Sequence, residues 1–434
     1  MKIAMIGAGY VGLVSAACLS DFGHEVICVD QDSDRITCLQ RGEMPIYEPG
    51  LAGLVKQNVA AKRLFFTEDL HAAVPDAEAV FIAVGTPERR GDGHADLHYI
   101  WAAAQQIAAA LAGYTVVITK STVPVGTNRQ LAAMMRQARP DAAFDVVSNA
   151  EFLREGAAIG DFMRPDRIII GVESARAAKV MEAIYRPLFL RDFPVVKTDL
   201  ESAETIKYAA NAFLAMKVSF INEMATLCEK TGADIKKVAT GIGLDGRIGR
   251  NFLKAGPGYG GSCFPKDTQA LIRMGQDFGA PQTLVEQVVA VNESVKRRMV
   301  EKLRALCGGG FAHMTVAILG VTFKPETDDI REAPSLSIIA ALLGEGAQLR
   351  ACDPQGWRNG AALLPGVTWH KDAYAAAQGA HLVVVLTEWN AFRALDLHRL
   401  AKAMATPRLA DLRNIYDRQA ALDAGFIAYT AVGR

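Results

Sequence analysis

The segment GPGYGGSCFPKD, residues 256–267, places one cysteine, Cys263, among residues that could make its thiol reactive. Its four glycines and two prolines exclude regular secondary structure, so we expect a shaped loop. Lys266 would favour the thiolate form, and Asp267 could handle a proton or a water molecule. Lone cysteines are often no more than small buried apolar residues. Chemistry alone therefore leaves two interpretations open: a covalent nucleophile and a structural thiol.

Lys207 and Asn211 form a second candidate group. They are four residues apart, so on a helix they share one face. Asn211 lies within the otherwise apolar run YAANAFLAM, and a buried amide needs a hydrogen-bond partner. The pair could donate hydrogen bonds to one reacting oxygen. The alternative is a structural asparagine beside a solvated lysine.

A glycine-rich motif lies near the N-terminus. Gly7, Gly9 and Gly12 follow a short apolar run in a G-x-G-x-x-G pattern, and Asp30 closes the next apolar run. Such glycines allow a tight turn and the close approach of a pyrophosphate to a helix N-terminus. Asp30 would accept hydrogen bonds from a ribose diol and repel a 2′-phosphate, which favours NAD. FAD, or a turn made only for packing, would also fit this motif alone.

Polar loops after other apolar runs could line the same crevice. Residues 148–155 (SNAEFLRE) carry Glu151 and Glu155, which would share a face if the segment were helical. Ordinary surface carboxylates are the alternative. The stretches GTP at 85–87 and STVP at 121–124 also follow apolar runs. In open α/β sheets, loops at the carboxyl ends of the strands bind ligands, so these segments are candidates too.

The elements that must position these residues follow from the spacing of apolar runs. In the first half of the chain, runs that are apolar on both faces alternate with helical patterns, which predicts a parallel sheet covered on both sides. The predicted strands span residues 3–7, 26–30, 64–67, 79–84, 116–119, 146–148 and 168–171.

From Thr198 the pattern becomes helical and nothing breaks it before Gly232. Thr198 and Glu201 would form a capping box at the start of this helix. A helix of this size is roughly 50 Å long, more than the width of a small domain, so we expect it to bridge two domains. Further helical sequence runs over residues 281–306.

A second α/β block begins near Thr315 and echoes the first. Residues 346–353 (GAQLRACD) parallel residues 23–30 (GHEVICVD). This weak duplication predicts two nucleotide-binding-type domains that flank a helical centre. Lys324 and Arg331 occupy the loop where the first block has its glycines, and cations there suit a phosphate.

Composition excludes several classes of protein. Lys plus Arg equals Asp plus Glu, 47 against 47, so no overall field attracts nucleic acid or an anionic membrane. The seven cysteines are scattered without a C-x-x-C pair, which predicts neither disulfides nor a metal site and favours a reducing cytoplasm. The apolar run over residues 1–19 resembles a signal peptide, but three glycines interrupt it. No other run reaches the length of a membrane span.

In their order along the chain, these segments resemble the UDP-glucose/GDP-mannose dehydrogenase family. The matching pieces are KIAMIGAGYVGLV, AVGTP, STVPVGT, EFLREG, ETIKYAANAFLAMKVSFINE, RIGRNFLKAGPGYGGSCFPKD and FKPETDDIRE. The resemblance implies an α/β fold with two Rossmann-like doubly wound domains joined by a long central helix and a helical dimerisation region. It divides the chain into an NAD-binding domain (1–197), a central helical dimerisation region with the catalytic loop (198–306) and a UDP-binding domain (307–434).

The resemblance also implies roles for individual residues. The residues expected to act in catalysis are Cys263, Lys207, Asn211, Glu151, Asp267 and Thr122. NAD contacts are expected at Gly7, Gly9, Tyr10, Val11, Gly12, Asp30, Arg35, Thr86, Thr122, Glu155, Lys266 and Arg331. The nucleotide sugar is expected at Glu151, Phe152, Leu153, Lys207, Asn211, Arg247, Phe252, Leu253, Lys254, Ala255, Gly256, Gly260 and Lys324. Arg247 matches an arginine that, in the family, reaches the substrate from the partner subunit of a homodimer.

The activity that the resemblance implies is the oxidation of UDP-glucose to UDP-glucuronate by two successive NAD-dependent steps. Cys263 would carry a thiohemiacetal and then a thioester, and Glu151 and Asp267 would align the hydrolytic water. One departure is visible, because family members commonly have proline where this chain has Ala150. GDP-mannose remains an alternative substrate. A catalytically silent nucleotide-binding regulatory protein remains an alternative of a different class.

Overall fold

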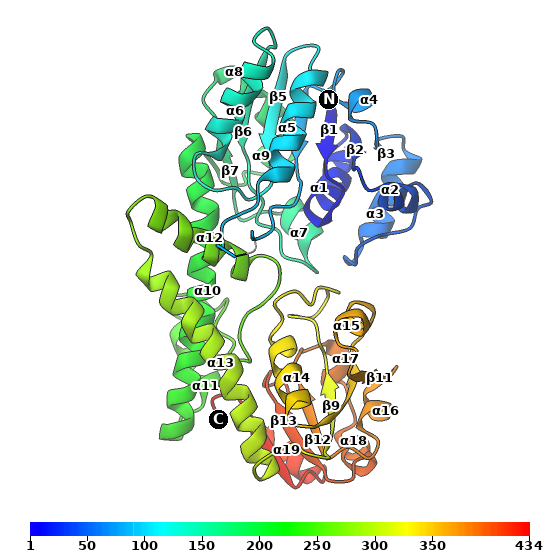
Figure 1. Ribbon diagram of the computed structural model, residues 1–434, viewed down its shortest axis with the longest axis vertical. Helices are drawn as coiled ribbons and strands as arrows, with labels where there is room; N and C mark the ends of the chain where they lie inside the picture. The colour runs from blue at the N-terminus through cyan, green and yellow to red at the C-terminus, as the bar shows by residue number, and fades with distance from the viewer. Residues whose placement is uncertain (90) are drawn as a thin grey trace. The chain divides into compact units, whose positions relative to one another are not determined.

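The computed structural model describes residues 1–89 and 91–434 and groups them into two compact units (Figure 1). The first unit holds Met1–Ala210 and Gln269–Gly279, and the second holds Asn211–Thr268 and Ala280–Arg434. Two helices, α10 (Leu200–Thr231) and α12 (Phe264–Asp277), contribute residues to both units.

The first unit contains an eight-stranded sheet with the order β3-β2-β1-β4-β5-β6-β7-β8. All neighbouring strands are parallel except β6 and β7, which pair in the antiparallel direction. The strands are β1 (Lys2–Ile6), β2 (Glu25–Val29), β3 (Leu64–Thr67), β4 (Ala79–Ile82), β5 (Thr115–Thr119), β6 (Phe144–Ser148), β7 (Ile168–Gly171) and β8 (Val195–Thr198).

Alternation along β1 explains why this sheet is covered on both faces. Ile3 and Met5 pack into one apolar core, whereas Ala4 and Ile6 pack into another on the opposite face. The strand is therefore apolar at nearly every position, as expected of a parallel sheet between helices. The helices of this unit are α1 (Tyr10–Asp21), α2 (Ser33–Gln40), α3 (Leu51–Ala60), α4 (Leu70–Ala73), α5 (His98–Ala110), α6 (Thr127–Ala138), α7 (Ala158–Met163), α8 (Ala175–Ile184) and α9 (Arg186–Phe189).

The second unit contains a six-stranded parallel sheet with the order β11-β10-β9-β12-β13-β14. Here too Val316 and Ile318 face one core while Ala317 and Leu319 face the other. Its strands are β9 (Thr315–Leu319), β10 (Gln348–Cys352), β11 (Val367–Trp369), β12 (Leu382–Val385), β13 (Arg408–Asp411) and β14 (Ala428–Ala431). Its helices are α11 (Ile235–Gly243), α13 (Thr283–Cys307), α14 (Pro334–Gly344), α15 (Trp357–Leu363), α16 (Ala373–Ala377), α17 (Asn390–Arg393), α18 (Leu397–Ala403) and α19 (Arg418–Asp423).

Both sheets begin with the strand order 3-2-1-4, which is the arrangement of doubly wound nucleotide-binding folds. The predicted fold class is therefore confirmed: two Rossmann-like sheets with a long central helix. The seven predicted strands of the first sheet all form, and their ends agree with the prediction to within two residues. The eighth, β8, was missed because it is a short edge strand whose Lys197 and Val196 are exposed. The three-part division of the chain stays a prediction.

The long helix α10 spans 32 residues, in agreement with the predicted uninterrupted helix. The predicted capping box is wrong, because Asp199 caps the helix instead. Its Oδ1 accepts the backbone N–H of Ser202 at 2.6 Å, and its carbonyl accepts that of Ala203. Glu201 is an ion-pair partner of Arg129, with Oε1 2.5 Å from Nε.

Candidate functional site

In the first unit, the turn between β1 and α1 is built by glycines that accept no side chain. A Cβ on Gly12 would lie 1.9 Å from the carbonyl oxygen of Gly7, and a Cβ on Gly7 would lie 2.6 Å from that of Ala83. Gly7 also has a φ of 106°. Gly9 differs, since a Cβ there would have open space around it. The N-terminus of α1, with Tyr10 and Val11 in its first turn, is thus left uncovered over Gly9, which fits the approach of a pyrophosphate.

Asp30 follows β2 and is tied to this turn. Its Oδ2 accepts the backbone N–H of Ala8 at 2.7 Å and pairs with Nη1 of Arg35 at 3.0 Å. Its Oδ1 accepts the N–H of Asp32 at 3.0 Å. Each carboxylate oxygen can accept two hydrogen bonds, so Oδ1 keeps the capacity to receive a ribose hydroxyl. Arg35 also pairs with Asp32, at 3.3 Å, so its guanidinium lies beside the carboxylate of Asp30.

Glu48 was missed by the sequence analysis, although it joins the glycine turn to the 151–158 loop. The phenol of Tyr10 donates to its carboxylate, which also accepts the N–H groups of Gly156 at 2.6 Å and Ala158 at 2.8 Å. Burial, followed by the hydrogen bond to Glu48, holds the pKa of Tyr10 far above its usual range. Residues 151–154 are not helical, so the condition under which Glu151 and Glu155 would share a helical face is not met.

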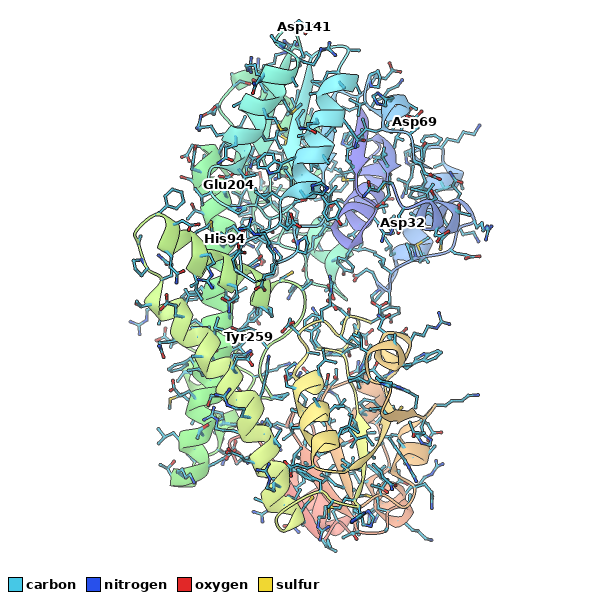
Figure 2. The ribbon with its side chains drawn as sticks, in the orientation of Figure 1. Asp32, Asp69, His94, Asp141, Glu204 and Tyr259 are labelled. Atoms are coloured by element: carbon cyan, nitrogen blue, oxygen red, sulfur yellow. The ribbon has the colours of Figure 1, made fainter. Side chains whose placement is uncertain are left out.

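The loops after β4 and β5 meet each other. The hydroxyl of Thr86 donates to the carbonyl oxygen of Thr122 at 2.9 Å. Just beyond them, Glu204 of α10 accepts the N–H groups of Gly126 at 2.6 Å and Asn128 at 2.8 Å, at the N-terminus of α6 (Figure 2). Burial raises the pKa of Glu204, although these hydrogen bonds oppose the shift. The two predicted cofactor loops are therefore fixed to one another and to α10.

Lys207 and Glu151 form a buried ion pair in this unit. The ammonium lies 3.3 Å from Oε1 of Glu151 and donates to its carbonyl oxygen at 2.6 Å. The backbone N–H of Leu153 donates to the same carboxylate. The ring of Phe152 lies 5.1 Å from the Lys207 ammonium, and the guanidinium of Arg167 lies 3.6 Å from that ring. Residues 151–153 and Lys207, predicted as one group from separate motifs, are thus brought together.

In the second unit, Cys263 is the last residue before α12, and the N–H of Asp267 donates to its carbonyl oxygen at 2.9 Å. Its side chain is partly exposed, and Sγ lies 3.6 Å from the hydroxyl of Ser262. The expectation of a loop through residue 267 is wrong for its last four residues, which are helical because proline is tolerated in a first helical turn. A thiol at a helix N-terminus is favoured as its thiolate.

Two buried asparagines, both missed by the sequence analysis, hold the glycine-rich loop before Cys263. Asn222 of α10 accepts the N–H of Gly256 at 2.8 Å. Asn292 of α13 accepts the N–H of Tyr259 at 2.8 Å and donates to its carbonyl oxygen at 3.2 Å (Figure 2). Like Asn211, each interrupts an apolar helical run, VSFINEM and VVAVNESV, and that signal could have found them.

Asn211 has the partner that its burial requires. Its side-chain amide donates to Oδ2 of Asp267 at 2.6 Å, while Lys266 lies 2.6 Å from Oδ1 of the same carboxylate. Asp267 is fully buried. The predicted residues Asn211, Lys266 and Asp267 therefore form one cluster in the second unit. Lys207 is one turn before Asn211 on α10.

Glycines also pack the loop against the segment before α14. A Cβ on Gly260 would lie 2.2 Å from the carbonyl oxygen of Glu332, and one on Gly261 would lie 2.8 Å from the ring of Phe323. The N–H of Gly261 donates to the carbonyl oxygen of Arg331 at 2.9 Å. Arg331 pairs with Asp329 at 2.8 Å and Lys324 lies 5.5 Å from the ring of Phe323, so both predicted cations stand next to this loop.

The remaining predicted sugar contacts lie directly before the loop. Leu253, Ala255 and Gly256 are buried, and Lys254 is exposed. Phe252 has a φ of 63° and packs against Phe264 with ring centroids 5.9 Å apart. The side chain of Arg247 is 89% exposed and pairs with Asp245 at 2.6 Å. An arginine so exposed is available to a neighbouring chain.

The surroundings of the seven cysteines differ. Burial raises the pKa of Cys18 and Cys352 to about 12 and that of Cys28 further still. Only Cys38 and Cys263 are not fully buried. Residues 1–89 and 91–434 contain no group of three or more side chains that could hold a metal ion. Within the same ranges, no helix has both the length and the apolar character needed to cross a bilayer.

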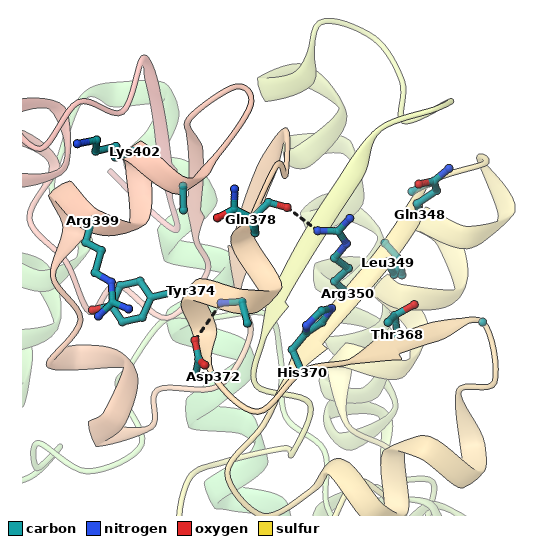
Figure 3. Close-up of a pocket in the computed structure, with 14 residues that line it drawn as sticks. Gln348, Leu349, Arg350, Thr368, His370, Asp372, Tyr374, Gln378, Arg399 and Lys402 are labelled. Carbon is teal, nitrogen blue, oxygen red and sulfur yellow. Dashed lines mark hydrogen bonds between the residues drawn. The ribbon is translucent and has the colours of Figure 1, made fainter.

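A hollow of about 1160 Å³ lies beside the edge of the second sheet and holds none of the predicted site residues (Figure 3). Residues of β10, β11, α16 and α18 and of the segments beside them line it, among them Arg350, His370 and Arg399. The guanidinium of Arg350 donates to the carbonyl oxygen of Gln378, and that of Arg399 lies 3.9 Å from the ring of Tyr374. Two of the cationic side chains that line the hollow are therefore already engaged in contacts within the fold.

Three family models match the chain in sequence. Residues 1–189 match the NAD binding domain of the UDP-glucose/GDP-mannose dehydrogenase family, residues 201–294 match its central domain, and residues 317–418 match its UDP binding domain. The matches follow the order of the motifs described above.

Similar proteins cover the full length of the chain. It is 56% identical to the UDP-glucose 6-dehydrogenase of Rhizobium meliloti, with 100% of each chain covered. It is 46% identical to the UDP-glucose 6-dehydrogenase TuaD of Bacillus subtilis, covering 100% of this chain and 93% of that one. A solved UDP-glucose dehydrogenase from Pyrobaculum islandicum shares 37% identity and a TM-score of 0.91, covering 99% of this chain and 96% of that one.

Proposed function

Because the chain belongs to the UDP-glucose/GDP-mannose dehydrogenase family, we propose that it oxidises UDP-glucose to UDP-glucuronate in two NAD-dependent steps. The observation that carries the proposal is similarity over the whole chain to relatives named UDP-glucose 6-dehydrogenase, at 56% and 46% identity. The cysteine, the lysine and the asparagine that the chemistry needs stand at Cys263, Lys207 and Asn211.

The first unit suits NAD. Open space over Gly9 leaves room for a pyrophosphate, and the carboxylate of Asp30 suits a ribose diol. Further contacts are proposed at Gly7, Tyr10, Val11, Gly12, Arg35, Thr86, Thr122, Glu155, Lys266 and Arg331. When bound, NAD accepts the hydride in each oxidation. Asp30 would repel a 2′-phosphate, so NADP should be a poor substitute.

In the first oxidation, the neutral amine form of Lys207, or a water molecule that it holds, takes the proton of the sugar's primary hydroxyl. The carbonyl oxygen and carboxylate of Glu151 fix the position of the Lys207 nitrogen. Asn211, held by Asp267, donates to the oxygen as negative charge develops there. Losing one such donor typically costs about 2.7–4 kcal/mol of transition-state stabilisation.

In the second oxidation, Cys263 is the nucleophile. Its sulfur adds to the aldehyde carbon, and the carbonyl oxygen takes up a proton, which gives a thiohemiacetal. Loss of a hydride from carbon and of the hydroxyl proton then gives a thioester. Water attacks the thioester carbon, the C–S bond breaks, and the thiol is released with the acid. Glu151 and Asp267 would align this water and handle its proton, and Thr122 would assist them.

The substrate and assembly follow the same proposal. The nucleotide sugar would contact Phe152, Leu153, Phe252, Leu253, Lys254, Ala255, Gly256, Gly260 and Lys324, and Arg247 would reach it from the partner of a homodimer. An exposed apolar stripe on α10 supports the dimer. Phe213, Phe220 and Leu227, spaced by seven residues, are 58%, 48% and 53% exposed. Seven residues are two helical turns, so these side chains lie on one face. Seven scattered cysteines without a C-x-x-C pair fit a reducing cytoplasm.

The experiment that tests the proposal measures NADH released per UDP-glucose consumed, with GDP-mannose in a parallel reaction. Two NADH per UDP-glucose, with no turnover of GDP-mannose, is the expected result. One NADH per sugar would mean that the reaction stops at the aldehyde. Turnover of GDP-mannose alone would keep the chemistry and change the substrate. Absence of turnover with both would favour a silent nucleotide-binding protein.

A variant separates the two oxidations. Cys263→Ser should allow the first hydride transfer and block release of the acid, because an oxygen ester does not turn over as a thioester does. Acid formation at the wild-type rate would refute the role of Cys263. Cys38→Ser is the matched control, since Cys38 is the other thiol that is not fully buried.

A further inference from the structure

A lysine that no motif indicated lies directly after β5. Lys120 is only 5% exposed, and its ammonium donates to Oδ1 of Asn149 at 3.1 Å and to the hydroxyl of Tyr185 at 3.1 Å. The rings of Phe162 and Tyr185 each lie 5.6 Å from it. Among the described residues, its hydrogen-bond partners are thus neutral groups.

A buried ammonium without a carboxylate in contact is unfavourable for folding. Burial accordingly lowers the pKa of Lys120 to about 8. A neutral side chain of similar length would fill the same volume without this cost, so the charge calls for another explanation.

The surroundings of Lys120 connect it with the reacting groups of the first unit. Asn149 precedes Glu151 by two residues, its N–H donates to the carbonyl oxygen of Thr119 at 2.9 Å, and its amide donates to that of Ile169 at 2.7 Å. The hydroxyl of Tyr185 also donates to Asn149, at 2.6 Å. The backbone that leads into Glu151 is therefore fixed on both sides.

Charge connects the same groups. The carboxylate of Glu151 favours the protonated form of Lys120, whereas the ammonium of Lys207 opposes it. These interactions are mutual. A positive charge at Lys120 therefore attracts the carboxylate of Glu151 and repels the ammonium of Lys207.

We propose that Lys120 is a positioning residue for the first oxidation: through Asn149 it holds the backbone that leads into Glu151, the partner of Lys207, and its buried charge acts on both of these groups. This inference rests on the proposed function, in which Lys207 or its water accepts the hydroxyl proton. Lys120 touches neither substrate nor cofactor in this account and acts through the other two residues.

The other groups around these charges do not take over this role. The phenol of Tyr185, whose pKa burial raises, stays neutral. The guanidinium of Arg167 stacks on the ring of Phe152. Lys120 thus supplies the positive charge on the side of β5.

The test is the pH dependence of the rate at which the first NADH forms in a single turnover of UDP-glucose. In Lys120→Met, Lys207 should hold its proton more tightly, so the acid limb of the profile should move about one unit or more to higher pH. The rate below that limb should fall roughly tenfold. Lys179→Met, which changes an exposed lysine of α8, is the control and should keep the wild-type profile.

A second variant serves if Lys120→Met does not fold. Asn149→Asp is nearly the same size and places a carboxylate against the Lys120 ammonium, so the acid limb should move in the same direction. A folded variant of either kind with the wild-type midpoint would overturn the role of Lys120. A wild-type protein that forms no NADH from UDP-glucose would instead overturn the proposed function, so the two failures are distinguishable.

Discussion

Asp30 in the first unit and Asp353 in the second occupy matching places. Each directly follows the second strand of its sheet, β2 or β10. Each accepts, at 2.7 Å, the backbone N–H of a residue in the loop after the first strand, Ala8 or Val321. Each loop also begins with a glycine at positive φ. The repeat noticed in the sequence is therefore a real structural correspondence.

The two carboxylates nevertheless differ in how many hydrogen bonds their oxygens already accept. Asp30 accepts three hydrogen bonds and keeps one oxygen with spare capacity. Asp353 accepts further hydrogen bonds from the N–H groups of Thr322, Gln355 and Gly356, the Thr322 hydroxyl and the indole of Trp389. It has no capacity left for a ribose. An aspartate at this place therefore identifies a ribose site only when its oxygens are not already used by the fold.

The largest change in stability should come from removing the carboxylate of Asp353, whose oxygens already accept hydrogen bonds from the fold. Asp353→Ala leaves several buried N–H groups without an acceptor, which should lower the free energy of unfolding by about 3–5 kcal/mol. Denaturant unfolding would measure the loss, with Asp30→Ala as the matched variant. An equal loss of unfolding free energy in the two variants would show that the two carboxylates contribute equally to the stability of the fold.

The pH dependence of the free energy of unfolding should differ between the two units, because each unit buries a different titratable group. The pKa of Lys120 is about 8 in the folded protein and 10.5 without burial. Below pH 8 the lysine is protonated in both states, and hydration of its ammonium stabilises the unfolded chain relative to the folded protein. Above pH 10.5 the lysine is neutral in both states and this stabilisation is absent. Stability should therefore rise by up to about 3 kcal/mol between these values, and Lys120→Met should remove this rise.

In the second unit, the buried carboxylate of Asp411 affects stability on the acidic side of the pH scale instead of the alkaline side. Burial raises its pKa from 3.8, so its contribution to stability is present in acid and is lost as pH rises through its folded pKa. A rise above pH 8 that persists in Lys120→Met would mean that another group produces it.

Asp30→Ala should act mainly on the cofactor. It removes a ribose acceptor, so the Kd for NAD should increase about tenfold or more, a change of about 1.4 kcal/mol. Discrimination against NADP should also weaken, because the negative charge is lost. Calorimetric titration of both cofactors would measure this. Unchanged NAD affinity would mean that Asp30 resembles Asp353 more than the geometry indicates.

The smallest change in stability should come from Gly9→Ala. Its φ of −71° suits alanine, and its Cβ would meet no atom within 4 Å. The free energy of unfolding, measured by thermal denaturation, should change by less than about 0.5 kcal/mol. NAD affinity should fall, because the methyl group occupies the space left for the pyrophosphate. Gly12→Ala is the contrast, since its Cβ would clash with Gly7 and unfold the turn itself.

The parts of the fold that the sequence predicted depend on short-range patterns. Apolar runs located seven strands of the first sheet, and the uninterrupted helical pattern located α10. Asn211 was recognised as needing a partner because an amide in an apolar helix is expensive to leave unpaired. The cap of α10 was misplaced by one residue, from Thr198 to Asp199, since neighbouring capping residues compete at similar energies.

The residues that the sequence could not reveal owe their roles to distant partners. Glu48 meets Gly156, and Lys120 meets Tyr185, across long stretches of chain. The saturation of Asp353 depends on Trp389, which belongs to another strand connection. No local pattern encodes such contacts, because they exist only after the sheet has brought its loops to one edge.

The unequal burial of the cysteines has a practical consequence for chemical probes. A soluble electrophile added at neutral pH meets only two partly accessible thiols, those of Cys38 and Cys263. Desolvation and the neighbouring carboxylate of Glu43 raise the pKa of Cys38 and so slow its alkylation. Cys263 lies directly before α12, and helix N-termini favour thiolates. The chain is thus suited to selective labelling, and a reporter attached there would replace the need to engineer a unique cysteine.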